Sequence, residues 1–171
     1  SFVYFGEFYK KKTPLKNENP KIEDIESSNL LSELNFSSED EKGNVYTLLA
    51  EEGEIDFENR NIIFLKKIKA VIKLKNSEEI LISSDFGKYN TENSDTIFSK
   101  NVLILYLDYK VNSDYLEFSI DKNLFTISKD VSLSNLEYSI NADVIEMNIN
   151  TRKVEIFMLE DLKKVKIKSI K

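Results

Sequence analysis

From residue 45 onward, apolar and polar residues alternate along the chain in short runs that polar turns separate. Successive side chains of a β-strand point to opposite faces, so this alternation predicts strands that bury one face. No window after residue 37 shows a helical period. We therefore expect an all-β protein built mostly from antiparallel strands.

Four stretches share one pattern: an alternating run that ends in a small residue and a carboxylate, then a large apolar residue, a polar turn and a second run. The small-acid pairs are Ala50-Glu51, Ser84-Asp85, Ser113-Asp114 and Ala142-Asp143. The last three pairs recur every 29 residues, and the first lies 34 residues before the second. Polar segments 58–61, 90–93, 121–123 and 150–152 are the predicted hairpin tips. A strand-turn-strand repeat of this length predicts an elongated stack of strand pairs.

The period of two defines an inner face if each small residue points inward. Large apolar side chains also recur fourteen residues beyond each small residue, at Phe64, Phe98, Ile127 and Ile156. Ten inward positions are the predicted lining of an apolar trough: Tyr46, Leu48, Ile80, Ile82, Tyr89, Phe98, Val111, Phe118, Ile127 and Ile140. Alternation alone leaves two interpretations open, a plain sandwich core and an open seam wide enough for lipid chains.

The first residues differ in character from the rest. Five aromatic residues within residues 1–9 precede Lys10, Lys11 and Lys12, which is typical of the end of a membrane helix. We interpret residues 1–12 as the end of a truncated membrane anchor, with a frayed aromatic tail as the alternative. Residues 13–29 contain both prolines and are expected to form a linker or extended arm. Residues 30–171 are expected to form the β-domain.

Composition narrows the function classes. The chain of 171 residues has a net charge of −6, which argues against a nucleic-acid partner. It contains no His and no Cys, so imidazole bases, thiol nucleophiles and the commonest zinc ligands are missing. We expect no enzyme, no cofactor and no metal site. The repeated acids are interpreted as solvated residues beside turns, and Gly53 and Gly87 as bends between strands.

Several motifs resemble the LptC family. The segment DEKGNVYTLLAE (residues 40–51) is similar to the opening of the family's β-domain, and SSDFGKYN (residues 83–90) is similar to its Ala-Asp-x-Gly-x-Tyr-Asp pattern. Lys100-Asn101-Val102 is similar to the Gly-Asn-Val that closes a repeat, with a lysine in place of the glycine. The resemblance covers residues 34–171, and the last repeat is irregular.

The resemblance implies a twisted, open β-jellyroll of stacked antiparallel strand pairs, held in the periplasm by a single inner-membrane helix. It implies that the protein receives lipopolysaccharide, in particular the lipid A acyl chains, from an ABC transporter of the LptB/LptF/LptG type. It further implies transfer to a soluble bridge protein of the LptA type through an open strand edge. An apolar trough without catalytic groups suits that role.

Two alternatives remain open at this stage. A soluble bridge protein of the LptA type would share the fold, but the aromatic and lysine-rich start of the chain favours an anchored protein. A structural β-solenoid that polymerises end to end would carry no ligand. An enzyme is the least favoured interpretation, because the sequence has no His, no Cys and no recognisable catalytic motif.

Overall fold

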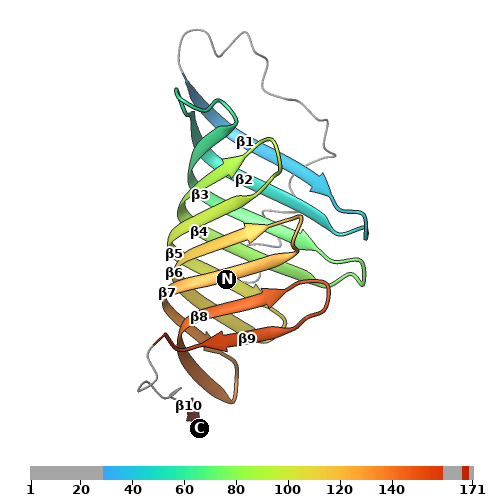
Figure 1. Cartoon of the computed structure of the whole chain (residues 1–171), viewed down its shortest axis with the longest axis vertical. Coiled ribbons are helices and arrows are strands. Elements are labelled where there is room, and N and C mark those ends of the chain that lie inside the picture. The colour runs from blue at the N-terminus through green and yellow to red at the C-terminus, as the bar shows by residue number, and fades with distance from the viewer. Residues whose placement is uncertain (1–28, 160–166, 170–171) are drawn as a thin grey trace.

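The computed structural model describes residues 29–159 and 167–169, and these form one antiparallel sheet of ten strands. Strands β1 to β8 pair in chain order, and β9 and β10 pair with different halves of β8. The strands are β1 (Leu30–Glu39), β2 (Val45–Ile55), β3 (Ile62–Lys73), β4 (Glu79–Asn90), β5 (Thr96–Tyr106), β6 (Tyr109–Ser119), β7 (Leu124–Ser134), β8 (Tyr138–Asn148), β9 (Val154–Phe157) and β10 (Ile167–Ser169). Figure 1 shows them stacked along the long axis, from β1 at the top to β8 and β9 near the bottom.

This architecture confirms the predicted all-β fold, a twisted open β-jellyroll. The four predicted hairpin tips coincide with the turns between β2 and β3, β4 and β5, β6 and β7, and β8 and β9, except that Asn90 is the last residue of β4. The membrane-anchor segment 1–12 and nearly all of the linker segment 13–29 lie outside the described residues, so both stay predictions.

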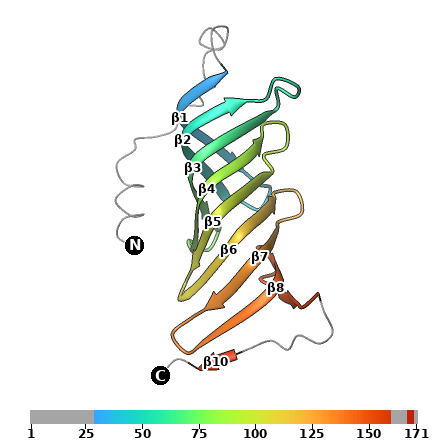
Figure 2. The same cartoon turned by 90° about the vertical axis from the view of Figure 1, so that its left-hand side faces the viewer.

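Each long strand bends near its middle, and the bends align into one crease. Residues with positive φ lie inside the odd-numbered strands, at Glu33, Lys67, Lys100, Asn101, Lys129 and Asp130. The ladder also shifts register opposite the later bends, between Ser83 and Phe86 and between Asn112 and Tyr115. Such bulges bend a strand sharply. The crease divides the sheet into two walls, and the strands of the front and back walls cross in Figure 1. Figure 2, turned by 90°, shows β1 to β8 stacked in chain order along the long axis.

We call the two walls the odd-turn wall and the even-turn wall. The odd-turn wall ends in the turns after β1, β3, β5 and β7, and the even-turn wall ends in the turns after β2, β4, β6 and β8. The opening between these two sets of turns, opposite the crease, is the seam. The apolar faces of both walls point into the space between them and form one continuous core.

The small-acid pairs mark the crease, so the repeated acids lie in the middle of long strands and their predicted position beside turns is wrong. Ala50, Ser84, Ser113 and Ala142 are buried on its inner side. The hydroxyl of Ser84 donates to the carbonyl of Phe86 at 2.8 Å, so the small polar side chain satisfies backbone at the bend. The following acids contact neighbouring strands across the crease: Glu51 pairs with Lys67 at 3.1 Å, and Asp85 accepts from the amide of Asn101 at 2.6 Å. The small residues therefore fit a tight corner and do not enlarge the interior.

Gly53 and Gly87 do not separate two strands, because each lies in the regular ladder of one continuous strand, beyond the crease. A Cβ atom on Gly87 would come within 2.2 Å of the Ile68 Cδ1 atom, and one on Gly53 within 2.3 Å of the Leu34 Cδ1 atom. These glycines allow the core side chains on the other wall or neighbouring strand to approach the backbone closely.

The inward assignment is wrong at Phe64. Its side chain is 47% exposed, whereas its predicted equivalent Phe98 is 1% exposed. The bend of β3 contains one residue with positive φ, Lys67, but the bend of β5 contains two, Lys100 and Asn101. The missing residue shifts the alternation by one position, and a slip of one residue exchanges the faces of a strand.

Candidate functional site

The ten predicted lining residues all point into the space between the walls. Nine are buried, and Ile140 is half-buried. Six of them surround one cavity in the half of the molecule nearer β1: Tyr46, Leu48, Ile82, Tyr89, Phe98 and Phe118. Val111, Ile127 and Ile140 line a second pocket near β8, and Ile80 is fully buried without lining either space. Their contact with lipid stays a prediction.

Aromatic rings fill the half of the trough nearer β1, which we call the upper trough. Phe36 packs against Tyr89 with ring centroids 4.4 Å apart, and Tyr46 lies 5.4 Å from Phe118 across the two walls. The remaining cavity is about 30 Å³, room for about two water molecules at most. In this conformation the upper trough is a packed core.

The half nearer β8, which we call the lower pocket, is open. Its volume is about 410 Å³, within the range of roughly 300–1,000 Å³ typical of small-molecule sites. Its lining is mostly aliphatic and aromatic, from β5 to β9, with tyrosines and one arginine added. Ile156 belongs to this lining although it is 36% exposed, so its inward assignment stands and its exposure reflects the open pocket.

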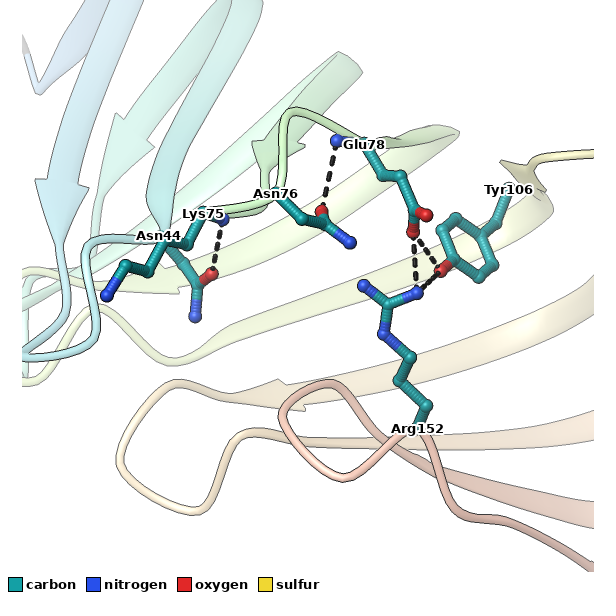
Figure 3. Close-up of polar contacts among 6 residues, drawn as sticks. All are labelled: Asn44, Lys75, Asn76, Glu78, Tyr106 and Arg152. Atoms are coloured by element: carbon teal, nitrogen blue, oxygen red, sulfur yellow. Dashed lines mark hydrogen bonds and ion pairs between the residues drawn. The ribbon is translucent and has the colours of Figure 1, made fainter.

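Polar contacts join the two walls across the seam, and the first group centres on Asn44. The side-chain amide of Asn44, which is buried, donates to Asp40 at 2.8 Å and to Asn150 of the opposite wall at 3.2 Å. Its carbonyl oxygen accepts from the backbone amide of Lys75 at 3.1 Å (Figure 3). Asn44 therefore links the turns after β1, β3 and β8.

Asp40 organises its own turn and reaches the trough. Its carboxylate accepts from the backbone amides of Lys42 and Asn44 and from the Tyr46 hydroxyl at 2.7 Å. Burial acts to raise the pKa of Asp40, but the hydrogen bonds from Asn44 and Tyr46 outweigh it and hold the pKa below 3.8. Burial and the hydrogen bond to Asp40 raise the pKa of the Tyr46 hydroxyl well above its usual value. The Tyr46 hydroxyl also lies 3.4 Å from the side-chain oxygen Oδ1 of Asn123 on the other wall.

The second group of contacts surrounds Arg152, at the tip between β8 and β9. Its Nη1 atom lies 2.7 Å from a carboxylate oxygen of Glu78 and 2.8 Å from the hydroxyl of Tyr106, both on the opposite wall (Figure 3). The Tyr106 hydroxyl donates to the same Glu78 oxygen. This bond, ahead of the charge of Arg152, lowers the pKa of Glu78 and keeps its carboxylate ionised. We call the contacts made by Asn44, Asn123, Asn150 and Arg152 across the seam the clasp.

Sequence reasoning missed the clasp entirely. Its partners are far apart along the chain: Asn44 and Asn150 are separated by 106 residues, and Glu78 and Arg152 by 74. Asparagine, glutamate and arginine in turns are ordinary surface residues, so no local pattern marks them. The sequence places the clasp residues in predicted turns, but that position does not show which residues they contact.

Within the described residues, the space between the walls is lined mainly by apolar side chains. Burying a large apolar side chain or an equivalent length of acyl chain stabilises by about 1.5–3 kcal/mol. The described residues contain no helix with the length and apolar character needed to cross a membrane. Fold and interior together define an open β-jellyroll with an apolar trough between two walls.

The comparison with protein families agrees with this description. Residues 1–159 match the family model described as lipopolysaccharide-assembly, LptC-related. The chain belongs to the LptC family, and its role therefore lies in lipopolysaccharide transport. A search of curated proteins returns no match to the chain.

Proposed function

We propose that the protein receives lipopolysaccharide from an ABC transporter of the LptB/LptF/LptG type and passes it to an LptA-type bridge protein. The acyl chains lie in the trough, and the sugar-phosphate head stays outside it. The observation that carries this proposal is the lower pocket, an apolar space of about 410 Å³ open between the walls of the jellyroll. Membership of the LptC family supports the same role.

Exposed strand edges are the proposed docking sites for both partners. Among the described strands, β1 pairs with β2 alone, so no described strand covers the other edge of this ten-residue strand. Such an edge is a template for an added strand from another protein. The short strands β9 and β10 form the opposite end of the sheet. Jellyrolls joined edge to edge would align their troughs into one path.

The proposed location is the periplasm, with a single inner-membrane helix holding the domain. The aromatic and lysine-rich residues 1–12 support this placement. Nothing in the proposal requires this chain to bind nucleotide, since the transporter supplies the energy for movement.

Photocrosslinking during active transport tests the trough. A photoreactive residue replaces Ile140, which lines the lower pocket, and the matched control replaces Asn141, the next residue, which is exposed. A second pair compares Phe118 in the upper trough with exposed Glu117. We expect lipopolysaccharide adducts at Ile140 and Phe118 and few at the controls.

Two outcomes would count against the proposal. Equal capture at Ile140 and Asn141 would show that lipid touches the protein without entering the trough. Capture at none of the four positions, together with filaments that lengthen with protein concentration, would favour the ligand-free structural solenoid.

A further inference from the structure

Arg152 lies at the mouth of the lower pocket. Among the described residues that line this pocket, it is the one charged side chain, and three tyrosines supply the other polar groups. The rest of the lining is aliphatic or aromatic. A pocket with an apolar body and a cation at its mouth matches an amphiphile with an anionic head.

The present contacts of Arg152 leave it able to bind such a head. Its side chain is 42% exposed and that of Glu78 is 30% exposed. The hydrogen bonds to Glu78 and to Tyr106 both use Nη1. A guanidinium group carries five N–H donors in a plane that suits bidentate phosphate binding. An ion pair this exposed is weak, so a phosphate can displace Glu78 at the cost of a few-fold in affinity.

We propose that Arg152 binds the phosphate of an amphiphile in the lower pocket, and that Glu78 competes with that phosphate for the guanidinium group. This inference rests on the proposed function, because it assumes that acyl chains occupy the pocket. To the proposed function it adds the head group that is recognised, a phosphate, and the residue that selects for it, Arg152. With net charge −6 the chain as a whole repels anions, so a local cation at the mouth is needed for selection.

The competition makes a prediction of opposite sign for the two partners. Arg152→Gln removes the cation, so the affinity for a phosphate-bearing amphiphile falls. Glu78→Gln leaves the cation in place and removes its competitor, so that affinity rises. Both changes break the same contact of the clasp, so an uncharged amphiphile should respond to both in the same direction.

Isothermal titration calorimetry of the full chain tests this with two probes of equal chain length, dodecyl phosphate and dodecyl glucoside, each below its micelle-forming concentration. We expect dodecyl phosphate to bind about fivefold more weakly to Arg152→Gln and about fivefold more tightly to Glu78→Gln. Arg152→Lys should retain part of the phosphate preference. High salt should reduce the difference in dodecyl phosphate affinity between Arg152→Gln and Glu78→Gln. Circular dichroism verifies that each variant keeps its strands.

The outcomes separate this inference from the proposed function. If both probes bind the parent protein but the two variants change dodecyl phosphate affinity in the same direction, Arg152 does not select the head group and the trough stands. If neither probe binds the parent protein, the lower pocket is not a lipid site, and both proposals fail.

Discussion

At the scale of single residues, Asp40 shows how one carboxylate fixes both a turn and the seam. It accepts hydrogen bonds from two backbone amides, from the Asn44 side chain and from the Tyr46 hydroxyl. Asn44 and Tyr46 in turn contact the opposite wall at Asn150 and Asn123. Four donors converge on one charge, and bonds to charged groups are the stronger kind. Loss of that charge should therefore weaken the turn and the clasp together.

The lowered pKa of Asp40 sets the sign of a pH effect. The folded state holds the ionised form more strongly than the unfolded chain does, so the stabilisation is complete above the ordinary value of 3.8 and is lost as pH falls through the lower folded value. Asp40→Asn should lower the free energy of unfolding by about 2 kcal/mol at neutral pH. The difference from the parent protein should shrink below about pH 4.

Urea unfolding at a series of pH values measures this difference directly. Subtracting the Asp40→Asn curve from the parent curve removes the contribution of the other carboxylates, including Glu78. A difference that stays constant from neutral pH to strongly acidic pH would show that the charge of Asp40 contributes nothing to the turn.

At the scale of the strand, the crease depends on residues whose backbone is left-handed. Lys67 has φ of 51° inside β3, and Lys66 beside it lies in the ordinary ladder. Both lysines are exposed and pair with a glutamate, Lys67 with Glu51 and Lys66 with Glu52. They form a matched pair that differs mainly in backbone conformation.

Glycine substitutions at these two lysines should have different effects. Glycine adopts positive φ without the cost of about 1–2 kcal/mol that a side chain carries, so Lys67→Gly should be neutral or stabilising. Lys66→Gly should destabilise by about 0.5–1 kcal/mol, because glycine weakens a regular strand. Chemical unfolding of both variants gives the comparison. Equal destabilisation would mean that the bend of β3 is not left-handed at Lys67.

The strands and hairpin tips could be predicted from sequence because both depend on local patterns. Alternation identifies the buried face, and polar turn residues mark its ends, so nine of the ten predicted lining residues are buried. The crease could not be predicted, because the sequence does not show where a strand contains left-handed residues or how many, and their number sets the face of the residues that follow. Phe64 therefore received the wrong face. The clasp was also out of reach, since contacts between distant turns follow from the twist of the whole sheet.

At the scale of the whole molecule, the two halves of the trough are in different states. The upper trough is filled by its own aromatic rings and held by Asn44 and Tyr46 at the seam. The lower pocket is open beside Arg152. Lipid bound in the lower pocket needs no rearrangement of the walls, but lipid reaching Phe118 must separate rings that now touch. We therefore expect the seam to open before lipid enters the upper trough.

Locking the seam tests this expectation. Lys75 and Asn150 lie on opposite walls and both contact the Asn44 side chain, at 3.1 and 3.2 Å. The chain contains no native cysteine, so Lys75→Cys with Asn150→Cys can be joined selectively by a short bis-maleimide. We expect the locked protein to lose lipid capture by a photoreactive residue at Phe118 and to keep capture at Ile140.

The control joins Asn61→Cys to Thr91→Cys in neighbouring turns of one wall, where the backbone amide of Thr91 donates to the carbonyl oxygen of Asn61 at 2.8 Å. This crosslink should leave lipid capture at both positions unchanged. Undiminished capture at Phe118 in the locked protein would show that lipid enters the upper trough without separating the walls there.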